Sequence, residues 1–132
     1  MSTVGTHYLC ELSGCNALAL NDLDTVKLAL NSAAAAAGVT ILGSFFHRFE
    51  PHGVSGLLCL AESHLAIHTW PRNQYAAIDI YTCGESVAPE KAVATLAAAF
   101  TAQGQVVSKV VRGIADMPSK YTHKIEVGFP MD

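Results

Sequence analysis

Three side chains with reactive atoms stand out in this sequence, namely Ser63, His68 and Cys83. A serine can act as a nucleophile beside a base, imidazole titrates near neutral pH, and a thiol can donate a proton. If a hairpin turn centres near Arg72 and Asn73, strand pairing puts Cys83 opposite Ser63 and the residue before it. A serine, a histidine and a cysteine then converge. Packing roles remain the alternative, with His68 as an interface histidine and Cys83 as a small buried residue.

Two other kinds of site are not expected. His64 and His68 are four residues apart, which on a strand separates them by about 13 Å, too far for one metal ion. Residues 53–56 (GVSG) begin like the nucleophile elbow of hydrolases, but Leu57 stands where that motif needs glycine. The sequence therefore predicts neither a metal centre nor an elbow.

Alternating strands and helices are expected to position these residues. Period-2 and β-branched patterns predict strands over 7–12, 39–49, 54–60, 64–70, 75–83 and 105–111. One helix is expected to begin after Asn21 or Asp22 and to end at Gly38, with Leu23, Val26, Leu30 and Ala33 or Ala34 on one face. A second is expected from Pro89 to near Gly104, with a stripe of Val93, Leu96, Ala97 and Phe100.

Two helices with one apolar stripe each, against a mostly antiparallel sheet, indicate an α+β fold, a two-layer α/β sandwich in one domain over 1–132. In the strand after Ser63, Leu65 and Ile67 point one way, while His68 and Trp70 point the other. Polar side chains should therefore gather on the sheet face away from the helices, where a substrate or a partner subunit would meet them.

Composition limits the partners and the location. Of the 132 residues, 51% are hydrophobic and 14% are charged, which predicts apolar surface hidden in a dimer or larger assembly. The net charge of −3 comes without a basic run, so no nucleic-acid partner is expected. With neither a membrane span nor a signal segment expected, we predict a cytoplasmic protein. The four cysteines do not follow metal or disulfide spacings.

A series of ordered motifs carries a family resemblance. The motifs are Gly53-Val54-Ser55-Gly56, Glu62-Ser63-His64, Ile67-His68-Thr69-Trp70-Pro71, Tyr75-Ala76-Ala77-Ile78-Asp79 and Thr82-Cys83-Gly84-Glu85. In this order and spacing they resemble the small prokaryotic S-adenosylmethionine decarboxylases, which are made as proenzymes and depend on a pyruvoyl group. Supporting pieces lie at 5–7, 46–49 and 112–113.

The resemblance implies self-cleavage. Ser63 would attack the carbonyl of Glu62, and elimination of the resulting ester would give fragments 1–62 and 63–132, the second starting with a pyruvoyl group derived from Ser63. Ser55 resembles the residue that steadies the tetrahedral adduct. His68 resembles the base that removes the α-proton of residue 63.

The resemblance also implies how the finished cofactor works. The pyruvoyl carbonyl would form a Schiff base with the small-molecule substrate, and Cys83 would return a proton to the α-carbon, giving decarboxylated S-adenosylmethionine for spermidine biosynthesis. Phe49 and Trp70 match the family's substrate pocket, built across a dimer of cleaved protomers. For Trp70, simple packing is an equal alternative.

Arg72 departs from the family pattern, which usually has an acidic residue after Trp70-Pro71. Arginine has five donors and no acceptor, so it cannot accept hydrogen bonds from ribose hydroxyls. Two alternatives therefore stay open: the same pyruvoyl chemistry on L-ornithine or L-arginine, and a non-catalytic binding relative. At the sequence level Arg72 is a substrate-binding candidate or a tolerated surface residue of the hairpin.

Overall fold

The computed structural model describes residues 3–61, 63–83, 87–114 and 125–127. The elements are β1 (Thr3–Ser13), α1 (Ala17–Asn21), α2 (Leu23–Ala37), β2 (Ile41–Arg48), β3 (Val54–Leu60), β4 (Ser63–Trp70), η1 (Pro71–Asn73), β5 (Tyr75–Thr82), α3 (Pro89–Ala99), β6 (Gly104–Ile114) and β7 (Ile125–Val127). The predicted strands and both main helices are confirmed. The short helix α1, the 3₁₀ turn η1 and strand β7 were not predicted.

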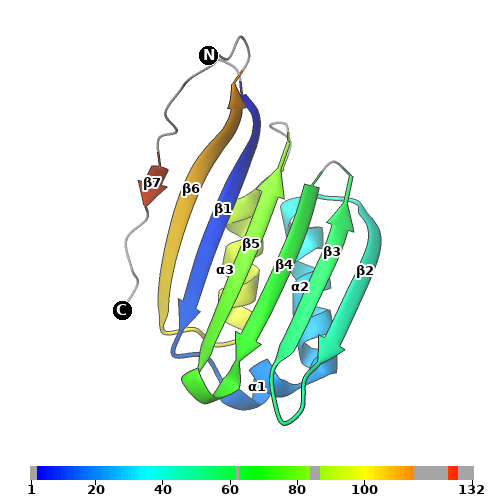
Figure 1. Ribbon diagram of the computed structural model, residues 1–132, viewed down its shortest axis with the longest axis vertical. Helices are drawn as coiled ribbons and strands as arrows, with labels where there is room; N and C mark the ends of the chain where they lie inside the picture. The colour runs from blue at the N-terminus through cyan, green and yellow to red at the C-terminus, as the bar shows by residue number, and fades with distance from the viewer. Residues whose placement is uncertain (1–2, 62, 84–86, 115–124, 128–132) are drawn as a thin grey trace.

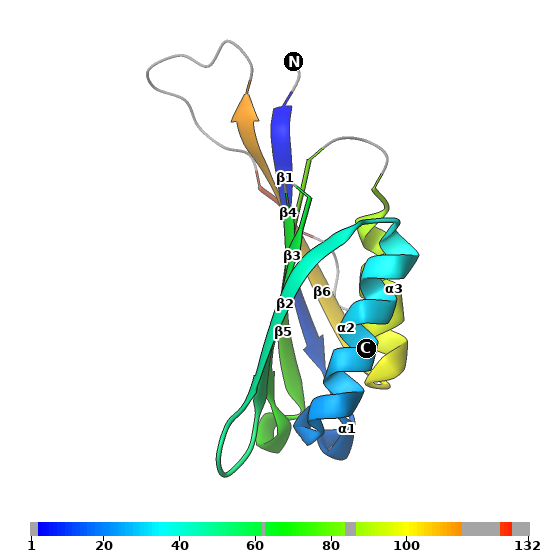
Figure 2. The ribbon, with the colours of Figure 1, turned by 90° about the vertical axis from the view of Figure 1, so that its right-hand side faces the viewer.

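The strands form a single sheet in the order β2-β3-β4-β5-β1-β6-β7, and neighbouring strands pair antiparallel (Figure 1). Helices α2 and α3 cover one side of this sheet, and no helix formed by the described residues lies on the opposite side (Figure 2). The predicted two-layer α+β sandwich is confirmed. We call the uncovered side the free face.

Local signals set the limits of α2. Asp22 caps its start, because its carboxylate accepts hydrogen bonds from the backbone N–H of Thr25 (3.0 Å) and from the Thr25 hydroxyl (2.5 Å). Gly38 ends the helix in the left-handed conformation, with φ of 79°. Of the two N-caps considered in the sequence, Asp22 is the one that begins α2.

The core lies between the helices and the sheet. Leu30 of α2, Ile67 of β4 and Phe100 after α3 are fully buried there. Along β4 the side chains alternate, with Leu65 and Ile67 in the core and His68 and Trp70 exposed. The predicted alternation along β4 is therefore confirmed. Among the described residues, no helix is long and apolar enough to cross a membrane.

The β4–β5 hairpin turns where the sequence predicts. Trp70 pairs with Tyr75, so the turn centres between Arg72 and Asn73. Gln74 completes it in the left-handed region, with φ of 52° and ψ of 40°. Its carbonyl accepts a hydrogen bond from the N–H of Cys15 (2.9 Å), and its side-chain amide donates to the Cys15 carbonyl (3.2 Å). The hairpin tip is thus fixed to the chain that leads into α1.

Candidate active site

Ser55 and His68 form a hydrogen-bonded pair on the free face. They are direct partners in the β3–β4 register, and Ser55 Oγ lies 2.7 Å from His68 Nδ1. Either group can donate, depending on the imidazole tautomer. This arrangement places a hydroxyl in hydrogen-bond contact with an imidazole, a pair of side chains between which a proton can be transferred.

A pocket of about 400 Å³ opens beside this pair. Phe49 and Trp70 are about half exposed and supply aromatic surface, and Trp70 is stacked on Tyr75 with ring centres 5.4 Å apart. The full lining is Phe49, His52, Gly53, Ser55, His68, Thr69, Trp70, Pro71, Arg72 and Asn73. The structure thus brings together five residues that the sequence singled out: Phe49, Ser55, His68, Trp70 and Arg72. His52 and Asn73 were missed, although both lie in turns next to predicted site residues.

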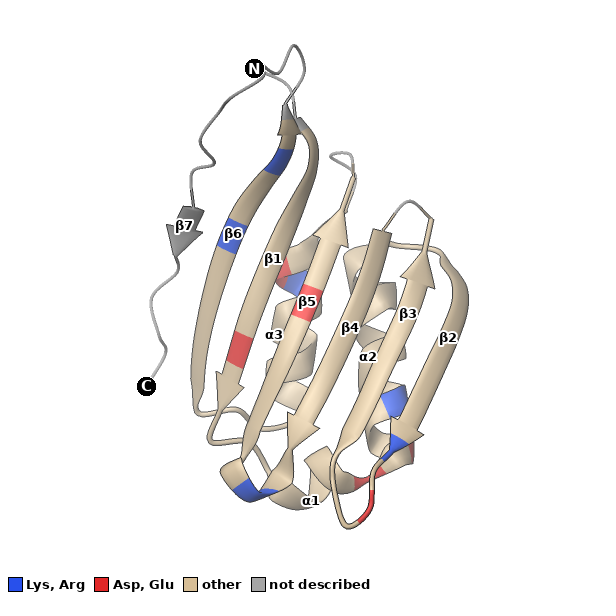
Figure 3. Ribbon diagram, viewed as in Figure 1, with Lys and Arg blue, Asp and Glu red and all other residues tan. Residues whose placement is uncertain are grey.

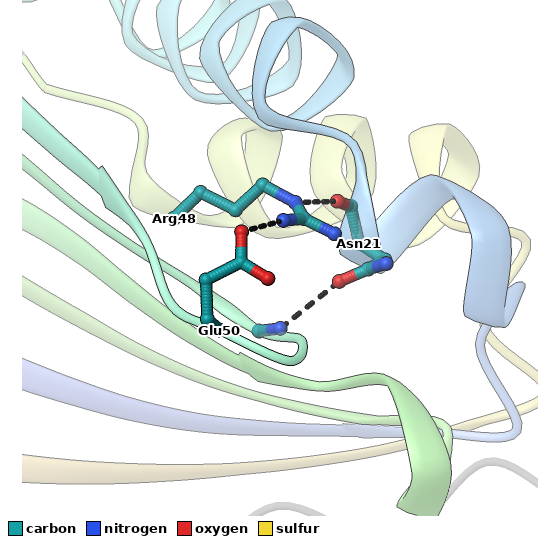
Figure 4. A network of polar contacts seen from close by, with 4 residues as sticks. Asn21, Arg48 and Glu50 are labelled. Carbon is teal, nitrogen blue, oxygen red and sulfur yellow. Dashed lines mark hydrogen bonds and ion pairs between the residues drawn. The ribbon is translucent and has the colours of Figure 1, made fainter.

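A polar network holds the β2–β3 loop that forms one wall of the pocket (Figure 4). Arg48 donates through Nε to the carbonyl of Asn21 (3.1 Å) and forms an ion pair with Glu50 (2.9 Å). The side chain of Asn21 accepts a hydrogen bond from the N–H of Gly53 (3.0 Å). Because Asn21 ends α1, this network ties the pocket wall to the helical layer.

Ser63 lies at the other end of β4. It starts the strand and is half-buried, and its hydroxyl donates a long hydrogen bond to the Ala61 carbonyl (3.4 Å). Glu62, the other residue of the expected cleavage site, lies outside the described residues. His64 pairs with Tyr81, so Cys83, two residues further on, lies at the same end of the hairpin as Ser63. This agrees with the predicted register.

One chain does not bring Ser63 and His68 together. They are five residues apart on β4, which corresponds to about 16 Å. The candidate residues therefore form two groups on one molecule. Ser63 and Cys83 lie at one end of the β4–β5 hairpin. Ser55, His68 and the pocket lie toward the other end.

A second polar cluster lies on the free face near the end of β4 that Ser63 begins, and it includes His7, which the sequence analysis did not single out. The Nε2 atom of His7 is 3.6 Å from Asp79 Oδ1 and is buried without a hydrogen bond. The rings of His7 and His64 meet edge-on, and Tyr81 stacks on His64. Burial, followed by the nearby His7, lowers the pKa of His64 below its ordinary value. Strand alternation predicts His64, Asp79 and Tyr81 on this face, whereas the contact with His7 depends on the pairing of β1 with β5.

The thiols differ in environment. Burial raises the pKa of Cys10 to about 12 and that of Cys15 to about 11, which keeps both unreactive at neutral pH. Cys59 is exposed and Cys83 is half-buried. Within the described part of the chain, no three His, Cys, Asp or Glu side chains are grouped to hold a metal ion.

Comparison with known proteins identifies the family. The family model described as S-adenosylmethionine decarboxylase matches residues 6–113. This chain belongs to the S-adenosylmethionine decarboxylase family. The resemblance inferred from the ordered motifs is confirmed.

Relatives and solved structures agree with this assignment. The chain is 42% identical over 125 residues to an S-adenosylmethionine decarboxylase proenzyme of Pyrococcus abyssi, covering 95% of this chain and 90% of the relative. It is 44% identical over 126 residues to a proenzyme of the same name from Thermodesulfovibrio yellowstonii, covering 95% and 93%. The crystal structure of the adenosylmethionine decarboxylase from Aquifex aeolicus matches with a TM-score of 0.81 and 29% identity, over 92% of this chain and all of that one.

Members of this family use a pyruvoyl group formed from an internal serine. Ser63 is an internal serine at the start of β4. It directly follows a tight β3–β4 turn, since Leu60 pairs with Ser63, and its hydroxyl is directed back toward the preceding backbone. The half-buried thiol of Cys83 lies at the same end of the sheet.

Proposed function

We propose that this protein is a self-processing decarboxylase of S-adenosylmethionine whose pyruvoyl group derives from Ser63. Family membership supports the reaction. The observation that carries the assignment of residues is the Ser55–His68 pair beside an aromatic pocket, on the strand that Ser63 begins. The product would be decarboxylated S-adenosylmethionine, the aminopropyl donor for spermidine biosynthesis.

Processing begins when the Ser63 hydroxyl attacks the Glu62 carbonyl. The C–O ester bond forms as the C–N peptide bond breaks. A base then removes the α-proton of residue 63, and the Glu62 carboxylate leaves, which separates fragments 1–62 and 63–132 of a single domain. The dehydroalanine that remains takes up water and releases ammonia to leave the pyruvoyl group. A serine hydroxyl is a poor nucleophile and its α-proton a weak acid, so both steps need positioned partners.

Those partners come from a second copy of the chain in this proposal. His68 is about 16 Å along β4 from the Ser63 of its own chain, so it cannot reach that residue. Two chains stacked through their free faces, with their β4 strands antiparallel, bring His68 of each chain to the end of the partner's β4 strand that Ser63 begins. Such a two-fold interface is self-complementary and creates two equal sites.

The middle of the free face is suited to such an interface. The midpoint between Ser63 and His68 on β4 falls at Leu65 and Ala66, and only Ala66 faces outward. Ala66 pairs with Leu57 of β3, which is 45% exposed, and Leu57 pairs with Phe45 of β2, which is 68% exposed. Strands β3 and β4 carry no Lys, Arg, Asp or Glu (Figure 3). This apolar row supports a two-fold axis near Ala66.

In turnover, the pyruvoyl group supplies a carbonyl that accepts the electron pair left when carbon dioxide departs, the role of pyridoxal phosphate in other enzymes. Cys83 returns a proton to the α-carbon. Phe49 and Trp70 hold the flat adenine ring by stacking, and the Ser55–His68 pair closes the polar side of the pocket.

Intact mass of freshly purified protein tests the processing. We expect two fragments that divide between Glu62 and Ser63, the second lighter by one ammonia than a serine-terminated peptide. Ser63→Ala should remain one uncleaved chain that is folded by circular dichroism. A wild-type chain that stays intact on incubation and releases no carbon dioxide from S-adenosylmethionine would contradict the proposal.

Complementation tests the shared site. Ser63→Ala and His68→Ala chains should each fail to self-cleave alone. When the two are mixed, unfolded and refolded together, the His68→Ala chain should be cut, because its Ser63 then meets the intact His68 of its partner. Cleavage that never appears in the mixture, although mixed dimers form, would show that each site lies within one chain.

A further inference from the structure

Arg72 supplies the fixed positive charge in the wall of the candidate pocket. Its neighbours in that wall include the imidazoles of His52 and His68, and no described lining residue is acidic. Among the described residues, no carboxylate forms an ion pair with Arg72. The pocket therefore presents hydrogen-bond donors and positive charge, without a compensating anion.

The nearest acidic residue of the pocket loops is directed elsewhere. Glu50 belongs to the β2–β3 loop, but its carboxylate pairs with Arg48, which also contacts the end of α1 (Figure 4). Glu50 is absent from the pocket lining. It therefore does not neutralise Arg72.

The backbone of Arg72 is held firmly. Pro71 before it is buried, and Gln74 after it is bound to Cys15 by two hydrogen bonds. The turn thus holds the backbone of Arg72 at the pocket wall, and the exposed Arg72 side chain extends from it. A ligand in the pocket is therefore within the electrostatic reach of this guanidinium.

We infer that Arg72 determines substrate specificity by acting as a charge filter: it admits a substrate whose distal part is a neutral hydrogen-bond acceptor, and it repels a distal ammonium or guanidinium. This inference rests on the proposed function, since it concerns the substrate of the same pocket. It decides between the substrates that the sequence left open.

The candidate substrates differ in where they carry positive charge. In S-adenosylmethionine the sulfonium lies close to the reacting carbon, and the distal adenosine is neutral with several acceptor atoms. In L-ornithine the ammonium nitrogen is one bond farther from the α-carbon than that sulfur and ends the molecule, and in L-arginine the terminal guanidinium carbon is farther still. Arg72 can donate hydrogen bonds to ring nitrogens or ribose oxygens, whereas it meets a distal cation as a like charge.

The test compares wild type with Arg72→Gln, which removes the charge and keeps an amide donor. Lys91→Gln on the remote helix α3 serves as the control for loss of one positive charge. L-arginine and L-ornithine are measured as competitors of S-adenosylmethionine turnover, and L-arginine binding is measured by calorimetry. We expect Arg72→Gln to tighten L-arginine binding about tenfold, with no change in the control.

The salt dependence of L-arginine binding distinguishes an electrostatic role of Arg72 from a purely structural one, because salt screens only the former. In about 1 M NaCl, where the Debye length is about 3 Å, wild type should bind L-arginine nearly as well as Arg72→Gln does. Equal affinity of the two proteins at low salt, or wild-type decarboxylation of L-ornithine or L-arginine as fast as that of S-adenosylmethionine, would overturn the filter. Failure of self-cleavage would instead overturn the proposed function, and the calorimetric comparison would still decide the role of Arg72.

Discussion

At the scale of single residues, the environment of His64 connects charge to stability. His64 is partly buried beside His7, whose ring centre lies 5.8 Å away, and the stacked Tyr81 carries Arg112 over its ring. Burial contributes most to the lowered pKa of His64, and His7 and Arg112 add to it, whereas Asp79 opposes them. The folded protein therefore favours the neutral form of this imidazole.

This lowered pKa predicts a loss of stability in acid. The unfolded chain binds a proton at His64 more readily than the folded chain, so the free energy of unfolding should fall as pH drops below about 6.5, the ordinary value for histidine. Urea denaturation at pH 7.5 and pH 5.5 measures the difference. His64→Gln should show a smaller difference between the two pH values. An unchanged pH dependence in His64→Gln would refute this explanation.

At the scale of the elements, the sequence predicts those features of the helices and strands that depend on local signals. The cap at Asp22, the stop at Gly38 and the alternation along β4 act over a few residues, so the helices, strands and faces were predictable. The five-residue helix α1 was missed because it is too short to show an apolar period.

The candidate site was predictable only in part. The identity of Ser55, His68 and Trp70 came from ordered motifs, and the common face of His68 and Trp70 came from strand parity. The position of Ser55 opposite His68 depends on the β3–β4 register. The anchoring of the pocket loop was not predictable, because Arg48 reaches the carbonyl of Asn21 across 27 residues of sequence. Contacts between residues so far apart in the sequence depend on tertiary packing, and no local sequence pattern indicates them.

Gly56 gives an element-scale prediction about how β2 and β3 pack. A β-carbon on Gly56 would lie 2.6 Å from the ring of Phe46 and 3.3 Å from Ile67. Gly56→Ala should therefore lower the free energy of unfolding by about 1–3 kcal/mol, as overpacking does. Chemical denaturation measures this change, and adding Phe46→Leu should recover part of it.

Gly43 on β2 is the matched control for this substitution. A β-carbon there meets nothing within 4 Å, so Gly43→Ala should leave stability nearly unchanged. If Gly56→Ala proved as stable as Gly43→Ala, the close packing of Phe46 over Gly56 would be wrong.

At the scale of the whole molecule, the described helices all lie on one side of the sheet and leave its free face uncovered by helix (Figure 2). Leu57 on this face should become buried when two chains associate as proposed. Leu57→Asp should therefore give a monomer in sedimentation velocity and should also stop self-cleavage. Leu28→Asp, on the outer side of α2 and 70% exposed, should change neither. A Leu57→Asp protein that remains dimeric and processed would refute the face-to-face arrangement.

The sheet order also has a consequence for a chain that is cut between residues 62 and 63. Fragment 1–62 carries β1, β2 and β3, and fragment 63–132 carries β4, β5, β6 and β7. Because β1 lies between β5 and β6, and β3 lies against β4, the two fragments are interleaved along three separate strand pairs. The severed polypeptide would thus behave as a permanent heterodimer of its own halves, and neither half could leave without dismantling the sheet. After cleavage, the strand pairs between the two fragments hold the fold together, and the peptide bond between residues 62 and 63 is not needed for it.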